Sequence, residues 1–404
     1  MKQLHSFSIV LVASLFLLTF SVSPNMGHGL EAGFGEADIT PPLGMPMSGY
    51  SARKDPSNGV WDPLFAQALV LNDGQTEVAI VTVDLIGPPP EEIQERIREK
   101  AQDKFGISMI VFVATHTHAG PRLLPDKPTP ENPWVDTLEP KIMETLSEAH
   151  SSKAPVFVEV GYTSVDISYD RRLIKPDGSV EMLWSNHERR PTTPVDQTIG
   201  VLGLNTKDGK RAITLVHFAC HPVIFGGKNL KYSAEYPDAL RDYVEKQLGG
   251  ECMFLQGACG EINPYIANHD NDEQGYRDLR DQGEIVAKEV VRITPYMKPV
   301  NHPLPIATRS YTTELKYRFD LKNEKTRQYY IDRYGEEYYQ KQLAERPPII
   351  EAETPIIVLG EQIAWAGFPG EFFDDFQVDL RRRSPIPNTF FLGYCNAGHS
   401  YFPT

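Results

Sequence analysis

Two histidines one residue apart follow a long apolar run in the segment VFVATHTHAGP, residues 111–121. His116 and His118 stand where an apolar strand would meet a loop, and Ala-Gly-Pro ends the run after them. In an extended strand, residues i and i+2 point to the same face, so both imidazoles would face one cleft. Imidazole is a common metal ligand and a common acid–base group. The stretch therefore indicates metal or proton chemistry.

Two further apolar runs end in a similar way. ITLVHFACHPV carries His217 and His221, and IAWAGFPGEFF carries Glu371. Two or three histidines with one carboxylate and an open position form a common catalytic zinc set. A lone histidine after a strand is more often a core or loop residue, and His217, which lies deeper in its run, is expected to be structural. The convergence of separate strand ends is what favours a metal site.

The apolar runs also define the elements that must position these side chains. Residues 77–87 and 107–118 are typical of buried strands, and the segment between them begins with Pro and acids and ends with Lys and Gly, like a helix. This order predicts a parallel strand pair. The expected fold class is α/β, with mixed β-sheets flanked by helices, in which ligands collect at the carboxyl ends of strands. Further strands are expected within 155–169, 198–205, 212–221, 252–260, 354–370 and 389–395, and further helices over 237–248, 273–292, about 324–344 and 370–383.

Composition places the chain among ordinary globular proteins. It has 404 residues, of which 41% are hydrophobic and 23% charged, enough for one large domain or two smaller ones. The formal net charge of −14 and the lack of a basic cluster argue against nucleic acid as a partner. The cysteines form no CxxC zinc motif, and buried free thiols are favoured over a disulfide between Cys252 and Cys259.

The N-terminus has the layout of a secretory signal peptide. Lys2 precedes the apolar stretch Phe7 to Phe20, and small residues follow it. The apolar run is too short to favour a membrane span, and no second stretch is long enough for one. Residues 1–29 are therefore interpreted as a signal peptide, cleaved between about Ser21 and Leu30. The mature protein is expected to be soluble and either periplasmic or secreted; peripheral membrane contact and the oligomeric state stay open.

Six motifs extend from about Glu31 to the last residue. They are GFGEADITPPLGMPMSGY, THTHAGP, HFACHPV, GACGEINPY, GFPGEFF and GYCNAGHSYFPT. In this order they resemble the neutral, non-lysosomal ceramidases, which are zinc amidases that cut the N-acyl bond of ceramide. The pairing of the THTH motif with the late PGE and NAGHSY motifs is specific, whereas any one motif alone is weak. The resemblance implies a single large catalytic domain over residues 30–404 and a small-molecule or lipid amide as substrate.

The resemblance also implies roles for individual residues. One zinc ion per chain would be bound by four side chains: His116, His221, Glu371 and Tyr401. His118 would sit beside the metal and handle protons. Arg171, in YDRRL, matches a substrate-contacting arginine, although Arg172 makes the alignment ambiguous by one residue. From residue type alone, Tyr401 is better interpreted as an aromatic anchor in the core, and Arg171 as half of a surface ion pair.

One position departs from the family pattern. Where the family has a serine that is needed for activity, in GDVSP, this chain has Asn263 in GEINP. An amide is no nucleophile, but its N–H donates hydrogen bonds, so Asn263 and Arg171 would steady an oxyanion or the polar groups of the substrate. The chain is also shorter than a full ceramidase, has no immunoglobulin-like second domain and stops three residues after Tyr401. A catalytic domain cut short at its C-terminus is one interpretation.

The expected function is zinc-assisted hydrolysis of an amide bond, in which His118 takes a proton from water and returns it to the leaving amine. Asp84 would either orient a ligand histidine or cap a loop. Two alternatives stay open. A hydrolase of the same fold would act on a different amide or ester, such as a glycan-linked one. A non-catalytic binder would keep the fold and the metal to hold a lipid or a sugar, because Asn263 replaces the serine.

Overall fold

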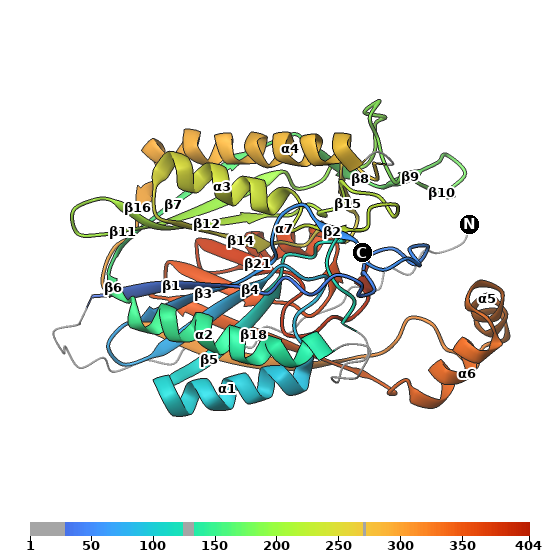
Figure 1. The fold of residues 1–404 in the computed structure, drawn as a ribbon, viewed down its shortest axis with the longest axis horizontal. Coiled ribbons are helices and arrows are strands. Elements are labelled where there is room, and N and C mark those ends of the chain that lie inside the picture. Colours follow the sequence, from blue (N-terminus) through green and yellow to red (C-terminus); the bar gives the residue numbers. More distant parts are fainter. Residues whose placement is uncertain (1–28, 124–132, 270–271) are drawn as a thin grey trace.

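Two five-stranded sheets and one four-stranded sheet form the body of the protein (Figure 1). The computed structural model describes residues 29–123, 133–269 and 272–404. The first sheet has the strand order β5-β4-β3-β1-β6, and α1 and α2 cover its outer face. β4 and β5 run parallel with α1 between them, which confirms the predicted strand–helix–strand unit. The elements are β1 (Glu31–Asp38), β3 (Phe65–Asn72), β4 (Glu77–Val83), α1 (Glu91–Phe105), β5 (Ile107–Ala114), α2 (Leu138–Ser151) and β6 (Ala154–Pro155).

The second sheet lies above the first, with α3 and α4 on its outer face (Figure 1). Its strand order is β14-β12-β11-β7-β16, and β12 and β14 form its parallel pair, connected through α3. The sequence predicted the main strands of this sheet and both helices to within a few residues. The elements are β7 (Phe157–Ser164), β11 (Thr198–Asn205), β12 (Arg211–Phe218), α3 (Tyr236–Leu248), β14 (Glu251–Gln256), α4 (Asp272–Ile293) and β16 (Lys298–Pro299).

The third sheet completes a hydrophobic core shared with the other two. Its strand order is β17-β18-β19-β21, and α7 connects the parallel strands β19 and β21. Leu69 of the first sheet, Leu215 of the second and Trp365 of the third belong to one buried cluster. Burial of these apolar faces holds the three sheets in one body. The elements are β17 (Ile306–Leu315), β18 (Ile350–Leu359), β19 (Ile363–Gly367), α7 (Asp374–Arg383) and β21 (Asn388–Leu392).

The three parallel pairs bring the candidate ligands to one region. His116 follows β5, His221 follows β12, and Glu371 follows β19, so each comes after the carboxyl end of a strand in a parallel pair. Short strand pairs then tie the connecting loops together. They are β2 (Gly59–Val60) with β13 (Lys231–Tyr232), β8 (Ser168–Asp170) with β15 (Ile262–Pro264), β9 (Arg172–Ile174) with β10 (Val180–Met182), and β20 (Glu371–Phe372) with β22 (Tyr401–Phe402).

Helix α2, which the sequence analysis did not predict, packs directly on β1 at two glycines. A Cβ atom on Gly33 would lie 2.0 Å from the Ala149 carbonyl oxygen, and one on Gly35 would lie 2.3 Å from the Thr145 carbonyl oxygen. Only glycine allows a helix backbone to approach a strand so closely. The pair of glycines in GFGEAD is therefore a packing feature of the first sheet.

The remaining differences concern the last third of the chain. The helix expected over 324–344 is two helices, α5 (Glu324–Tyr334) and α6 (Glu336–Glu345), because Gly335 has a φ of 90° and ends the first. The helix expected from residue 370 begins only at Asp374. The residues in between, Glu371 and Phe372, are extended instead, because they pair with β22.

Two expectations from composition can be compared with the described residues. All four cysteines are buried and free, as favoured from the sequence. Within the described ranges, no helix combines the length and apolar character that a membrane crossing needs. The stretch interpreted as a signal peptide lies outside the described residues, apart from Gly29.

We expect Gly35→Ala to destabilise the protein by about 1–3 kcal/mol, because the new methyl group would overlap the backbone of α2. Urea unfolding followed by circular dichroism measures the change. Gly87→Ala is the matched control, since a Cβ atom there has nothing within 4 Å. Equal stability of the two variants would contradict the close packing of α2 on β1.

Candidate metal centre

Four side chains direct nitrogen or oxygen atoms toward one buried point. His116, His118 and His221 each offer a ring nitrogen, and these three atoms lie within 4.8 Å of one another. The Glu371 Oε2 atom lies 3.6 Å from His116 Nε2 and 3.4 Å from His221 Nε2. The Nε2 atoms of His116 and His118 are 3.2 Å apart. The fold thus brings together residues from three separate sheets.

His116 lies in a loop and not in the strand. β5 ends at Ala114 and is an edge strand, and His116 has a φ of 68°, which residues other than glycine rarely adopt. The prediction that strand alternation points His116 and His118 into one cleft is therefore wrong. The two rings come together because the chain turns at His116. Its Nδ1–H donates to the Ile86 carbonyl at 2.6 Å, and its ring stacks on Tyr394 with centroids 3.8 Å apart. These contacts direct Nε2 into the cluster.

His221 and Glu371 are held by backbone contacts. The His221 backbone N–H and ring Nδ1–H both donate to the Ile262 carbonyl oxygen, at 3.0 Å and 3.1 Å. A carbonyl only accepts, so the ring proton sits on Nδ1 and the lone pair of Nε2 faces the cluster. Glu371 is fixed by the parallel pairing of β20 with β22, in which it lies opposite Tyr401.

Two of the atoms that face the centre are unsatisfied within the described residues. His221 Nε2 and Glu371 Oε2 are buried and have no hydrogen-bond partner there. Buried polar atoms without partners are rare in folded proteins because their desolvation is unfavourable. A cation at the common point would satisfy the Nε2 and Oε2 lone pairs together. The donor set of imidazoles and one carboxylate therefore fits a metal of the zinc type.

Burial keeps the histidines in the form that binds metals. It lowers the pKa of His116 to about 4, although the carboxylate of Glu371 acts in the opposite direction. Burial also holds the pKa of His118 and that of His221 well below the ordinary value for histidine. Near neutral pH these imidazoles are uncharged, and a neutral imidazole is a ligand or a base.

Arg171, Asn263 and Tyr401 form a hydrogen-bonded group beside Glu371. Arg171 Nη2 donates to the Tyr401 hydroxyl at 2.9 Å and to the Gly260 carbonyl at 2.6 Å, and Nη1 donates to Asn263 Oδ1 at 3.5 Å. Asn263 Nδ2 donates to the Trp184 carbonyl at 3.3 Å. Desolvation of the hydroxyl, and then the Glu371 carboxylate, raise the pKa of Tyr401, so its hydroxyl stays protonated. All three predicted residues therefore lie together. Tyr401 as a whole is 44% exposed, so its interpretation as an aromatic anchor in the core is wrong.

The two neighbouring arginines lie in different surroundings. Arg171 is buried and faces the cluster, whereas Arg172 donates to the Asp170 carboxylate at 3.0 Å and lies over the Phe373 ring. The pairing of β8 with β15 sets Asp170 opposite Ile262, and so places Arg171 next to the segment that carries Asn263. An ion pair with Asp170 is formed by Arg172 instead of Arg171, and the Asp170 carboxylate is buried.

More than half of the chain matches a known protein family. Residues 30–270 match the model of the family described as neutral/alkaline non-lysosomal ceramidase, N-terminal, and this match covers more than half of the chain. The chain belongs to this family. The matched region contains the three clustered histidines, and Glu371 and Tyr401 lie beyond it.

Solved structures extend the likeness to nearly the whole chain. A neutral ceramidase from Pseudomonas aeruginosa matches with a TM-score of 0.71 and 18% identity, over 93% of this chain and 68% of that one. A ceramidase complexed with C2 matches with a TM-score of 0.70 and 18% identity, over 93% of this chain and 70% of that one. At this identity the likeness establishes the fold, which confirms the expected α/β class with mixed sheets.

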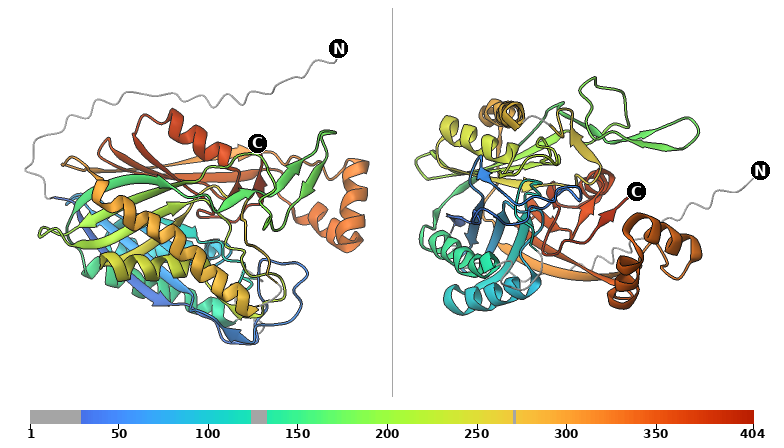
Figure 2. Two further views of the ribbon diagram at one scale, coloured as in Figure 1. Left: turned by 90° about the horizontal axis from the view of Figure 1, so that it is seen from above. Right: turned by 45° about the vertical axis from the view of Figure 1, so that its right-hand side comes forward.

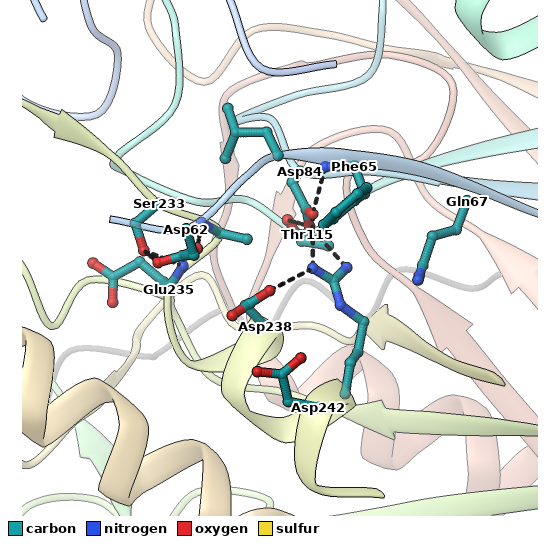
Figure 3. Close-up of polar contacts among 12 residues, drawn as sticks. Asp62, Phe65, Gln67, Asp84, Thr115, Ser233, Glu235, Asp238 and Asp242 are labelled. Atoms are coloured by element: carbon teal, nitrogen blue, oxygen red, sulfur yellow. Dashed lines mark hydrogen bonds and ion pairs between the residues drawn. The ribbon is translucent and has the colours of Figure 1, made fainter. Parts of the chain in front are cut away.

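Asp84 does not orient a ligand histidine in this ceramidase-family chain. Its carboxylate accepts hydrogen bonds from the Phe65 backbone N–H at 2.9 Å and the Thr115 hydroxyl at 3.1 Å (Figure 3). Both of its oxygens also pair with Arg241, at 3.2 Å and 2.8 Å. The carbonyls of Ile86 and Ile262 orient the histidines instead. His217, expected to be structural, lies outside the cluster, with Nε2 at 2.6 Å from the carbonyl oxygen of Phe391.

Sequence reasoning missed the residues that surround His118. A pocket of about 600 Å³ is lined mainly by residues 46–55, with Ile86 and Arg122 on its border. Tyr50 from this segment meets the His118 ring edge-on, with centroids 5.3 Å apart, and Arg53 donates to the His118 carbonyl at 3.0 Å. A Cβ atom on Gly49 would lie 2.6 Å from His118 Cβ, so only glycine fits there. In the sequence this segment stood out only through the family motif GFGEADITPPLGMPMSGY, which assigned no role to its residues.

We expect the metal-free protein to lose stability as the pH falls from about 6.5 toward 4. Histidines of the unfolded chain titrate near 6.5, whereas burial holds the pKa of His116 at about 4. Between these values the unfolded chain binds more protons than the folded chain, so the free energy of unfolding decreases as the pH is lowered. His116 alone accounts for a decrease of about 2 kcal/mol at pH 5 relative to neutral pH. Urea unfolding of chelator-treated protein at neutral and acidic pH measures this.

His116→Ala serves as the reference for this measurement. It removes one of the buried titrating groups, so its free energy of unfolding should depend less steeply on pH in the same interval. A wild type whose stability is the same at both pH values would show that these imidazoles are not kept neutral by burial.

Proposed function

We propose that this protein is a zinc-dependent hydrolase of N-acyl amide bonds and that its substrates are of the ceramide class. One observation carries the proposal: His116, His118, His221 and Glu371 surround one buried point in a chain of the ceramidase family. The reaction would add water across the C–N bond of a lipid amide and release a carboxylic acid and an amine. Two solved ceramidases with the same fold support the assignment.

The separations of the side chains suit one zinc ion bound between them. Two ligand atoms that each lie about 2.0–2.1 Å from one ion are about 3–4 Å apart. The Glu371 oxygen lies 3.6 Å from His116 Nε2 and 3.4 Å from His221 Nε2. We assign these three side chains as ligands and Tyr401 as the fourth, because it lies opposite Glu371 in the pairing of β20 and β22.

His118 would handle the proton. Zinc held by these ligands would supply Lewis-acid chemistry, since it polarises a carbonyl and lowers the pKa of water. The His118 ring borders the ligand cluster on one side and Tyr50 on the other. Burial keeps its pKa low, so the ring is a free base that takes a proton from the attacking water. It would then return that proton to the nitrogen of the leaving amine as the C–N bond breaks.

Arg171 and Asn263 would position polar groups at the centre. The Arg171 guanidinium is buried, and its hydrogen bonds to Gly260, Asn263 and Tyr401 fix its orientation. A fixed cation near the scissile carbonyl stabilises the negative charge that develops on its oxygen. Both the oxygen and the nitrogen of the Asn263 amide are hydrogen-bonded to the protein, so its role would be to hold Arg171 and Trp184 in place. Water is then the nucleophile, because an amide side chain forms no acyl-enzyme.

Export from the cytoplasm is part of the proposal. Its support is the sequence pattern of Lys2 followed by the apolar stretch Phe7–Phe20, which lies outside the described residues. The mature chain would then meet its lipid substrate outside the cytoplasm, in the periplasm or the extracellular medium.

The engaged amide of Asn263 favours one alternative. If the serine of the ceramidases is indispensable, a chain with Asn263 in its place would keep the metal and the fold and bind a lipid or sugar without cleaving it. A hydrolase acting on another amide or ester, such as a glycan-linked one, is the second alternative. Hydrolysis of ceramide by wild type and by Asn263→Ser separates these functions.

Purified protein should contain close to one zinc per chain by elemental analysis, and His116→Ala and His221→Ala should each lose it. Removing one of three or four ligands weakens zinc binding by orders of magnitude, because the remaining side chains cannot complete the coordination. His187→Ala is the control, since His187 is exposed and lies outside the cluster.

His118→Ala distinguishes the two roles available to this histidine. We expect it to retain zinc and to lose turnover by about 10²–10⁴, the usual contribution of a general acid or base. Loss of zinc comparable to that of His116→Ala would make His118 a ligand. Unchanged zinc content in all three variants would show that the cluster is not the metal site.

Zinc-loaded wild type should release fatty acid from a fluorescent short-chain ceramide, and Asn263→Ser should show whether the family serine adds to this rate. A hydroxyl at this position supplies a donor or nucleophile that the engaged amide does not. A silent wild type that becomes active as Asn263→Ser would identify the protein as a non-catalytic binder. A wild type that ignores ceramide but cleaves another amide or ester would favour the second alternative.

A further inference from the structure

The β9–β10 hairpin projects from the body (Figure 2). It carries three exposed apolar side chains. Ile174 is 57% exposed, Val180 52% and Met182 38%. Ile174 and Val180 are cross-strand partners, and Met182 follows Val180 by two residues. Cross-strand partners and residues two apart lie on the same face of a two-stranded ribbon. The three apolar side chains therefore lie on one face of the hairpin, together with Arg172, the cross-strand partner of Met182.

The opposite face of the hairpin is charged. Glu181 alternates with Val180 and Met182, so it points to the other side of the ribbon. It forms ion pairs with Lys175 at 3.1 Å and with Arg190 at 3.0 Å. The hairpin is thus amphipathic, and within residues 29–123, 133–269 and 272–404 nothing covers Ile174, Val180 and Met182, which remain exposed.

The apolar face leads to the candidate centre. Trp184 follows Met182 by two residues, is 58% exposed and lies next to Arg171, whose guanidinium carbon is 5.6 Å from its ring centroid. The Trp184 carbonyl accepts the hydrogen bond from Asn263. A lipid chain lying along the hairpin would therefore reach the group of residues that borders Glu371.

A second exposed aromatic surface lies on α5 and α6. Tyr329, Tyr330, Tyr334 and Tyr338 form a ladder whose successive ring centroids are 6.0, 5.7 and 5.1 Å apart. Residues 316–346, which carry this ladder, contain eight Lys and Arg against six Asp and Glu, in a chain with a net charge of −14. Both the ladder and the hairpin project from the end of the molecule near which the C-terminus lies (Figure 1 and Figure 2).

We propose that the apolar face of the β9–β10 hairpin, assisted by the tyrosine ladder, docks this protein on a phospholipid bilayer. The inference deepens the proposed function and rests on it, because a lipid amide is embedded in a membrane and must be drawn from it. Clustered exposed apolar side chains mark interaction surfaces in soluble proteins. Tyrosine is favoured at the membrane–water interface, where its ring is partly buried and its hydroxyl stays hydrated.

Charge would orient the protein on the bilayer. An anionic lipid surface repels a body that carries a large negative charge and attracts a basic segment. The net positive segment 316–346 is therefore the part that an anionic membrane would attract, and the hairpin emerges at the same end of the molecule. A second copy of the chain would carry the same charge at its own basic segment, and like charges at the contact would disfavour that pairing.

The test is sedimentation with large unilamellar vesicles, made of phosphatidylcholine with or without phosphatidylglycerol. Wild type should bind both kinds, and binding should be stronger with phosphatidylglycerol. Ile174→Ser, Val180→Ser and Met182→Ser together should reduce the partition coefficient by about tenfold or more, because three apolar side chains are lost from the contact. The matched control is Phe157→Ser with Tyr296→Ser, two exposed aromatics at the opposite end, near β16.

Activity assays separate docking from catalysis. The hairpin variant should lose hydrolysis of long-chain ceramide in vesicles in proportion to its binding and keep hydrolysis of a soluble short-chain amide. Wild type that stays in the supernatant, or a hairpin variant that binds like wild type, would overturn the docking surface. So would a concentration-dependent dimer in sedimentation velocity that the hairpin changes abolish. Vesicle binding without hydrolysis of any amide would instead overturn the proposed function and leave the docking surface standing.

Discussion

The structure depends on one electrostatic constraint, namely that acceptor lone pairs are buried and aimed at a common point. Burying a polar atom without a partner is unfavourable by several kcal/mol, so a fold keeps such an arrangement only if other contacts impose it. Here the carbonyls of Ile86 and Ile262 impose it, because each accepts the Nδ1–H of a histidine and leaves Nε2 facing inward. The positive φ of His116 is a second sign that the backbone is shaped for this centre.

The surroundings hold these carbonyls and loops in place. The buried carboxylate of Asp84 connects the start of β3, the end of β5 and helix α3, through Phe65, Thr115 and Arg241 (Figure 3). Nearby, Asp62 accepts hydrogen bonds from the Ser233 hydroxyl and the Ala234 backbone N–H, both at 2.6 Å. These acids are therefore structural, and they fix the connections behind the centre. Breaking such a buried pair leaves a charge uncompensated, which is why each carboxylate has several partners.

The sequence predicted those features of the fold that depend on residues close together in the chain. The apolar runs gave the central strands, and the order strand–helix–strand gave the parallel pair β4–β5, because both depend on neighbours along the chain. Prediction from local pattern failed where an element depends on a partner that is distant in the sequence. Helix α2 is recognisable by its fit on Gly33 and Gly35 of β1, more than 100 residues earlier, and Glu371 is extended only because β22 pairs with it. Tyr401 entered the candidate site through family resemblance, since a lone tyrosine near a terminus carries no pattern of its own.

Asn263 links the chemistry of the centre to the surface that leads to it. Its Oδ1 accepts from Arg171 and its Nδ2 donates to the Trp184 carbonyl, so one side chain joins the buried guanidinium to the base of the β9–β10 hairpin. A serine has one short hydroxyl and would reach only one of these two partners. With serine, the hairpin base would be released from Arg171 while a hydroxyl became free for the substrate. If Asn263 occupies the position of the family serine, asparagine would replace a reactive group with a rigid connection at the point where a lipid would enter.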